Sequence, residues 1–337
     1  MDTNHVLSDV FRKKGIRLKS LGLKDASAVT EQFVCSGNKG KAIEDFSTEK
    51  YSLKKIGFVK KPLSKKDMVG NHFRIKISEC SDGLSSFEEF DKVLNFYGYQ
   101  RFGSKRPVTH LIGKAIVQRN FEKAIELILS FTSSYDSKEN SEIRQKLADK
   151  QNFQQYFDQI PRQMDIERIV IKEMIEHDDA FHAIRSIPLS LRRFYIQAYQ
   201  SFIFNQSLSA AFSDGENLFE AESGDVCFDF KGVIGKFVKG LDQKLALPFV
   251  GYSYYKKTRF GYQISEVLKQ EEISPKDFFI KEMQEVSNEG GFRQAAIHCT
   301  NYSSHDNSVE FTLSRGSFAT ILLREIMKPS DPILAGF

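Results

Sequence analysis

Gly22-Leu23-Lys24-Asp25-Ala26-Ser27-Ala28-Val29-Thr30-Glu31-Gln32 is the most informative stretch of the chain, because it sets one carboxylate between a glycine turn and a β-prone run. Gly22 permits a positive φ. Residues 28–34 are rich in strand-forming side chains, which predicts a strand. A carboxylate at the mouth of a strand can face a cleft and act as a nucleophile. The residues alone leave open an ordinary turn aspartate that bonds its own backbone.

The basic residues are concentrated around this stretch. Residues 1–120 contain 23 Lys and Arg against 13 Asp and Glu, whereas residues 121–275 contain 19 against 23 and residues 276–337 contain 6 against 8. Such a concentration suits a polyanion, because each phosphate that is neutralised releases condensed counterions. Solvated surface lysines are the plainer alternative. The charge distribution therefore favours a nucleic acid as partner.

Length and composition set the broad class of protein. A chain of 337 residues predicts two domains. The four cysteines, Cys35, Cys80, Cys227 and Cys299, form no C-x-x-C pair, so neither a zinc knuckle nor a disulfide framework is indicated. No apolar run approaches the roughly 18 residues that span a bilayer, and the first residues lack a signal-peptide pattern. We expect a cytoplasmic protein with no membrane partner.

Hydrophobic periodicity and turn residues predict the following elements. Helices are expected over residues 4–18, 87–94, 120–130, 190–211 and 317–328, with Ser317 as a cap of the last. Strands are expected over residues 72–77, 294–299 and 309–313. Seven glycines between residues 213 and 262 indicate small β elements.

Three further segments carry recognisable patterns. They are Asn95-Phe96-Tyr97-Gly98-Tyr99-Gln100-Arg101-Phe102-Gly103, the helix from Arg193 to Ser209 with its Gln-Ser and Phe-Asn pairs, and Phe311 to Glu325. With residues 22–32, these segments resemble, in the same order, the motifs of archaeal-type members of the TruD family of tRNA pseudouridine synthases. The resemblance spans residues 22–325.

This resemblance implies an α+β fold with a pseudouridine synthase-type catalytic domain, in which helices flank a mixed, mainly antiparallel sheet. It implies a catalytic domain of residues 1–120 and 276–337, interrupted by a TruD insertion domain of residues 121–275. It also implies an isomerase that acts on a tRNA uridine, the one at position 13. Breaking the N-glycosidic bond and rejoining the base through carbon requires no cofactor or metal. We expect a monomer.

The resemblance also implies roles for individual residues. The family's catalytic aspartate corresponds to Asp25. The target base must leave its stack and needs an aromatic platform, for which Tyr97 and Phe318 stand at matching positions. Asn95 and Gln100 can hydrogen-bond the uracil edges or hold the loop through backbone bonds. Arg101 and Arg315 can bind phosphate or pair with Asp25.

The sequence departs from the family pattern in two places. Met1 falls inside what resembles the helix before the aspartate motif, so we expect the family's preceding strand and its lysine near the aspartate either to lie outside this sequence or to be missing. Ala26 stands where a basic residue is usual. Both departures bear on the ionisation of Asp25, because a nearby opposite charge keeps a carboxylate ionised.

Two other patterns favour structural explanations. Metal-competent side chains gather between Glu173 and His182, but no H-E-x-x-H spacing occurs, and a polar helix face accounts for them. The run Gly232-Val233-Ile234-Gly235-Lys236 lacks the spacer and the hydroxyl residue of a phosphate loop.

Three hypotheses for the function remain open at this point. The first is the tRNA-modifying isomerase. The second is a catalytically silent RNA-binding relative. The third is a small-molecule α/β enzyme, which predicts no salt-sensitive affinity for RNA.

Overall fold

The computed structural model describes residues 1–24, 28–37, 44–64, 67–78, 84–89 and 91–337. The chain forms two units, Met1–Asn71 and His72–Phe337. In the described residues no helix is both long and apolar enough to cross a membrane. The predicted boundaries of the catalytic and insertion domains, at residues 120 and 275, stay a prediction.

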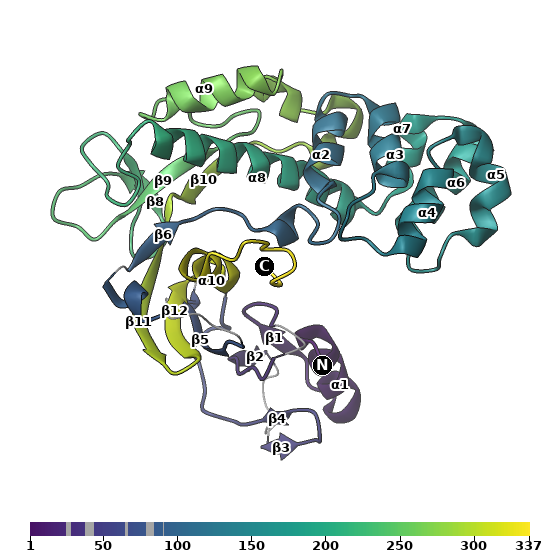
Figure 1. Cartoon of the computed structure of the whole chain (residues 1–337). Helices are drawn as coiled ribbons and strands as arrows, with labels where there is room; N and C mark the ends of the chain where they lie inside the picture. Colours follow the sequence, from purple (N-terminus) through teal and green to yellow (C-terminus); the bar gives the residue numbers. More distant parts are fainter. Residues whose placement is uncertain (25–27, 38–43, 65–66, 79–83, 90) are drawn as a thin grey trace. The chain divides into compact units, whose positions relative to one another are not determined.

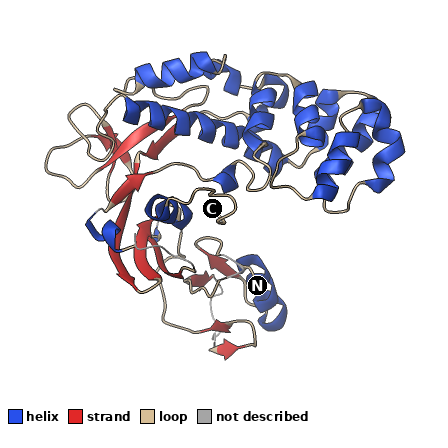
Figure 2. Cartoon of the chain, in the orientation of Figure 1, coloured by secondary structure: helices blue, strands red, loops and turns tan. Residues whose placement is uncertain are grey.

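The first unit is built from one helix and short antiparallel hairpins (Figures 1 and 2). Its elements are α1 (Thr3–Lys14), β1 (Leu18–Ser20) paired with β2 (Val34–Ser36), and β3 (Phe46–Ser47) paired with β4 (Ser52–Leu53). The side chain of Asp2 caps α1, and Gly15 ends it in the left-handed conformation. The strand predicted over residues 28–34 begins only at Val34, where β1 supplies hydrogen-bonding partners.

An antiparallel sheet in the order β5-β12-β11-β6 carries the second unit's smaller core. Its strands are β5 (Gly70–Lys76), β6 (Lys92–Leu94), β11 (Ala296–His305) and β12 (Ser308–Ser314), and helix α10 (Ala319–Met327) packs against it. The predicted strands over residues 72–77 and 309–313 and the last helix are thus confirmed, whereas the strand predicted over residues 294–299 begins only at Ala296 in this sheet. The helix predicted over residues 87–94 is wrong, because residues 92–94 pair with β11 and only a 3-10 turn, η2 (Ser85–Glu89), precedes them.

The larger core belongs to a helical array and a second sheet, ordered β10-β9-β7-β8. The strands are β7 (Val226–Phe228), β8 (Ile234–Lys236), β9 (Lys244–Phe249) and β10 (Gly291–Gln294). The helices are α2 (Thr109–Val117), α3 (Phe121–Ser130), α4 (Lys138–Lys146), α5 (Phe153–Tyr156), α6 (Asp165–His177), α7 (Ala180–Ser186), α8 (Leu189–Ser213) and α9 (Gly261–Gln270). Short 3-10 turns complete it: η3 (Tyr99–Arg101), η4 (Lys150–Asn152), η5 (Phe157–Gln159), η6 (Pro275–Phe278) and η7 (Lys281–Val286).

Helix α8 is the central element of this array. It packs closely against α2 at Gly113, where an added Cβ would lie 2.1 Å from the backbone oxygen of Tyr195. Only glycine allows the two helix backbones to approach so closely. Tyr199 and Phe204 on α8 are fully buried. The predicted helix of residues 190–211 is confirmed, as are the small β elements between residues 213 and 262.

Candidate active site

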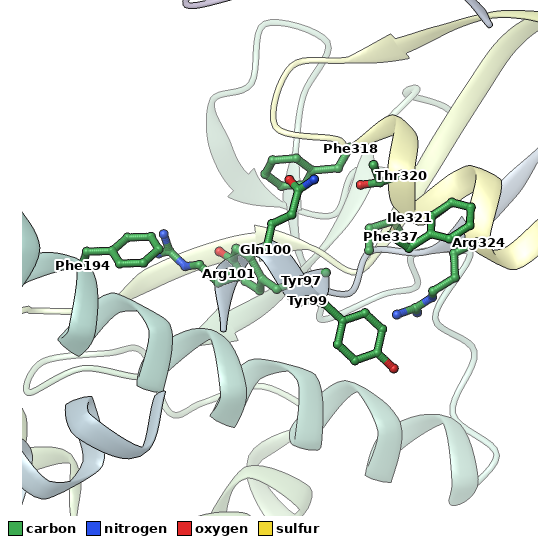
Figure 3. A pocket seen from close by; sticks show the side chains of 11 residues that line it. Tyr97, Tyr99, Gln100, Arg101, Phe194, Phe318, Thr320, Ile321, Arg324 and Phe337 are labelled. Atoms are coloured by element: carbon green, nitrogen blue, oxygen red, sulfur yellow. The ribbon is translucent and has the colours of Figure 1, made fainter. Parts of the chain in front are cut away.

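A pocket of about 210 Å³ lies in the second unit, where three of the patterned segments meet (Figure 3). The 95–103 segment, α8 and the start of α10 supply most of its lining, which consists of Tyr97, Gly98, Tyr99, Gln100, Arg101, Phe194, Phe318, Thr320, Ile321, Arg324 and Phe337. These segments are about 100 residues apart along the chain. Their convergence gives the pocket an aromatic wall, one neutral amide and two guanidinium groups.

The 95–103 segment is fixed by α8 on one side and by α10 on the other. Asn205 accepts a hydrogen bond from the backbone N–H of Tyr97 at 2.8 Å and donates one to the Tyr97 carbonyl at 3.0 Å. At Gly98, an added Cβ would lie 3.1 Å from Cδ1 of Ile321. These contacts hold the pocket wall rigidly, as a preorganised binding site requires.

Arg293, on β10, is a residue that sequence reasoning missed. Its guanidinium lies 3.9 Å from the centre of the Tyr97 ring and 5.8 Å from that of Phe318. Nη2 donates to Oδ1 of Asn95 at 2.6 Å. Burial lowers the pKa of Arg293. A single arginine thus links three predicted site residues.

Asn95 lies inside the protein, with only 2% of its surface exposed. Its Nδ2 donates to the carbonyl of Gln294 at 2.9 Å, and its Oδ1 accepts from Arg293. Of the two roles open from sequence, this geometry matches the one in which Asn95 holds the loop. Its direct contact with substrate stays a prediction.

Arg101 lines the pocket along the side of α8. Its Nε donates to Oγ of Ser201 at 3.0 Å, and its guanidinium carbon lies 5.0 Å from the Phe194 ring centre. Burial lowers its pKa. Within the described part of the chain, neither Arg101 nor Arg293 forms an ion pair with a carboxylate. The pocket therefore keeps positive charge that an anionic ligand can neutralise.

Gln100 and Phe318 are the exposed members of the pocket wall. Phe318 is 46% exposed, and the Gln100 side chain extends toward its ring (Figure 3). Tyr97 is more enclosed, because its ring packs edge-on against Phe204 at 5.8 Å and beneath Arg293. The predicted cap Ser317 is buried, and Phe318 instead stands at the helix start without a side-chain cap bond.

With this geometry in place, comparisons with known proteins decide the family. A model of the family "tRNA pseudouridine synthase D (TruD)" matches residues 1–326. The chain belongs to the TruD family.

Individual relatives agree with that assignment. A "Probable tRNA pseudouridine synthase D" of Pyrobaculum islandicum is 29% identical, with all of this chain and 83% of the relative aligned. A relative with the same name in Archaeoglobus fulgidus is 30% identical over 96% of this chain and 84% of its own length. The crystal structure of a TruD protein from Methanosarcina mazei matches with a TM-score of 0.80 at 28% identity, covering 98% of this chain and 86% of that one.

Three predictions from sequence are therefore confirmed. They are the family, the α+β fold and the enzyme class, a tRNA pseudouridine synthase and hence an isomerase. The predicted site residues are not tested by these similarities. Their roles remain proposals.

The TruD aspartate motif belongs to the first unit, and Asp25 lies outside the described residues. Residues on either side of it are anchored by one hydroxyl, because Oγ1 of Thr3 accepts from the backbone N–H of Lys24 at 2.9 Å and from Nε2 of Gln32 at 3.0 Å. Nζ of Lys24 also donates to Oδ1 of Asn71. The ends of the motif are thus fixed to α1 and to the start of β5.

Arg315 lies in the turn between β12 and α10, is exposed, and is not among the residues that line the pocket. Its predicted phosphate contact stays a prediction. The alternative phosphate-loop pattern at residues 232–236 forms the β7–β8 hairpin instead, with Gly232 at a φ of 75° in the turn. A hairpin offers no helix N-terminus for a phosphate group.

Proposed function

We propose that this protein converts a uridine of tRNA, the one at position 13, into pseudouridine. The observation that carries the proposal is the meeting of three TruD motif segments around one pocket, which is lined by aromatic rings, the amide of Gln100 and the guanidinium groups of Arg101 and Arg324. The pocket volume of about 210 Å³ is below the about 300–1,000 Å³ typical of sites for drug-sized ligands. That size suits a single flipped nucleoside.

In this proposal the pocket binds the extruded base. Phe318 offers an exposed ring face for stacking, worth about 1–3 kcal/mol per base. The amide of Gln100 can pair with one edge of uracil. Tyr97, Asn95 and Arg293 hold the wall in shape, while Arg101 favours the approach of a phosphate.

Asp25 is the proposed catalytic carboxylate. It either attacks the ribose or the base, or removes a proton during glycal formation. In every case the N1–C1′ bond breaks, the base rotates and a C5–C1′ bond forms, while the C5 proton leaves and N1 gains one. The reaction is therefore an isomerisation that conserves all atoms.

Residues 121–275 are proposed to form the TruD insertion domain. The segment contains α3 to α9 and strands β7 to β9, and its charge is acidic where residues 1–120 are basic. It also includes α8, which supplies Phe194 to the pocket and Asn205 to the 95–103 segment.

The test is carbodiimide mapping of a tRNA transcript incubated with the full chain. We expect one new pseudouridine, at position 13, with wild-type protein and none with Asp25→Asn. Glu31→Gln is the matched control, because Glu31 is an exposed carboxylate in the same stretch. Salt-sensitive binding of tRNA without any conversion by the wild type would contradict the proposal and favour the silent RNA-binding relative.

A further inference from the structure

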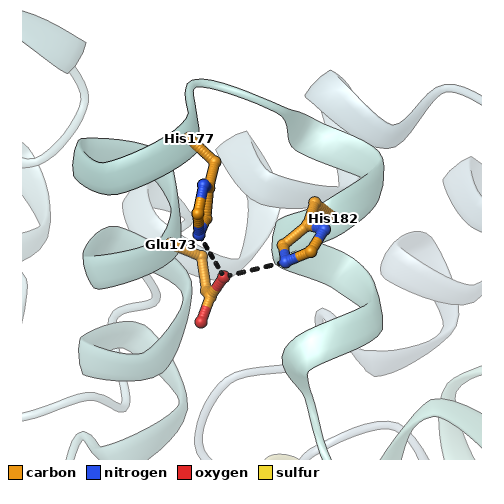
Figure 4. Close-up of side chains that lie close together, drawn as sticks. All are labelled: Glu173, His177 and His182. Carbon is orange, nitrogen blue, oxygen red and sulfur yellow. Dashed lines mark ion pairs between the residues drawn. The ribbon is translucent and has the colours of Figure 1, made fainter.

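Three metal-competent side chains converge at the junction of α6 and α7 (Figure 4). Oε2 of Glu173 lies 3.8 Å from Nε2 of His177 and 3.3 Å from Nε2 of His182. The ligand atoms of all three residues lie within 4.8 Å of one another. Two imidazole nitrogens therefore face the same carboxylate oxygen.

The backbone that presents these side chains is held firmly. Glu173 and His177 are four residues apart on α6, which places them on one helix face. Helix α6 ends at Asp178 in the left-handed conformation, with a φ of 51°. The next residue, Asp179, caps α7 by accepting from the backbone N–H of His182 at 2.9 Å. The two helices pack through buried residues of the larger core, so the three ligand positions are fixed relative to one another.

The spacing matches what a late first-row divalent cation requires. Bonds of about 2.0–2.2 Å to nitrogen and oxygen put neighbouring tetrahedral ligands about 3.4 Å apart. The separation of 3.3 Å between Glu173 and His182 is close to this value, whereas the Glu173–His177 separation is 3.8 Å and all three ligand atoms lie within 4.8 Å of one another. Rotation of the exposed histidine side chains can bring the ligand atoms closer together. The carboxylate and two imidazoles form the ligand set that zinc prefers when one position is left to water.

We propose that Glu173, His177 and His182 bind a zinc-class divalent cation that links the C-terminal end of α6 to the first turn of α7. The sequence suggested only a polar helix face, because the third ligand comes from the next helix. None of the three residues lines the pocket, so the role of the ion is to tie the two helices together.

The experiment is a zinc titration of the chelator-treated chain of 337 residues in competition with a chromophoric chelator, with cobalt as a spectroscopic probe. We expect one site per chain, an intense visible cobalt band typical of low coordination number, and a zinc-dependent rise in Tm. His177→Gln or His182→Gln should weaken zinc affinity at least about 10-fold, and the double variant should abolish both the cobalt band and the zinc-dependent rise in Tm.

His305→Gln is the matched control. His305 is exposed, and its Nε2 lies 3.3 Å from Oδ2 of Asp306, but it is not part of the three-ligand cluster. This variant should bind zinc as the wild type does. His177 and His182 are half exposed, so their replacement should leave the fold intact. Wild-type zinc affinity and stoichiometry in the His177→Gln/His182→Gln double variant would overturn the proposal.

Discussion

Two groups of buried or partly buried arginines in the second unit differ in how their positive charge is compensated. Arg144 pairs with Glu167 at 2.6 Å and with Asp136 at 2.9 Å, and Arg106 shares Glu167 at 3.2 Å. Arg101 and Arg293, at the pocket, are held by aromatic rings, a hydroxyl, an amide and backbone carbonyls. One group is neutralised within the protein, and the other keeps its charge.

This difference indicates that the first group stabilises the fold and that the second is available to bind an anionic ligand. Burying an ion pair is costly, but breaking one leaves an uncompensated charge inside the protein. The Arg106–Arg144 group therefore stabilises the packing of α3, α4 and α6. Burial removes water from the guanidinium groups of Arg101 and Arg293 and lowers the pKa of both. Charge-assisted hydrogen bonds from these groups to a bound phosphate can offset the cost of this desolvation.

The largest expected effect is on stability. Arg144→Met removes the arginine partner of Asp136 and one of the two arginine partners of the buried Glu167, and it should reduce the free energy of unfolding by about 3–5 kcal/mol. Chemical denaturation measures this loss. The exposed Arg162→Met is the matched control and should change stability by less than about 0.5 kcal/mol. An Arg144→Met protein as stable as the control would show that the two groups do not differ.

Arg293→Met should act mainly on substrate. We expect kcat/KM for tRNA to fall about 10–100-fold, because the wall formed by Tyr97 and Asn95 loses its shared support. Arg293→Lys should not rescue the enzyme, since an ammonium cannot both cover the ring and reach Asn95. Steady-state kinetics with a tRNA transcript checks both variants. Full activity in Arg293→Lys would mean that charge alone is required.

Phe318→Ala should have a somewhat smaller effect, confined to binding. Loss of one stacking face should raise KM or Kd by an amount equivalent to about 1–3 kcal/mol. Phe318→Tyr keeps the ring and is the matched control. An unchanged Kd in Phe318→Ala would assign the ring to the core of α10 rather than to the base.

The last prediction concerns His110, whose ring centre lies 4.9 Å from that of Phe202, on which it stacks, and 5.2 Å from that of Phe102. Burial lowers the pKa of His110 to about 4, against about 6.5 in the unfolded chain. Between these values the unfolded state binds more protons, so stability should decrease as the pH falls from about 6.5 to about 4.

His110→Phe should reduce that slope by at most about 1.4 kcal/mol per pH unit. Denaturation curves at several pH values measure the slope, with His305→Gln as control for the loss of an exposed histidine. An unaltered slope in His110→Phe would contradict a buried neutral His110.

Local sequence patterns predicted the helices and strands that bury apolar residues at regular spacing along the chain. The stripe of α10, the alternation of β5 and the aromatic helix α8 all follow from spacing. The strand at residues 92–94 was not predicted from spacing, because its apolar residues have helical spacing. Pairing with β11, about 200 residues later in the chain, outweighs that local preference. Strand pairing over such a distance leaves no local signal.

The site was predictable to the same extent. Motif segments pointed to Tyr97, Gln100, Arg101 and Phe318, all of which line the pocket. They did not point to Arg293, because a single basic residue between Phe292 and Gln294 matches no motif and gives no local signal of function. The convergence of His182 with Glu173 was likewise hidden, since it depends on the turn between two helices.

The most direct test measures tRNA affinity and single-turnover pseudouridine formation for Asp25→Asn and Phe318→Ala with one transcript. We expect Asp25→Asn to bind tRNA within about twofold of wild type and to form no pseudouridine, and Phe318→Ala to bind more weakly yet convert bound tRNA. Pseudouridine formed by Asp25→Asn at the wild-type rate would contradict the assignment of the catalytic carboxylate.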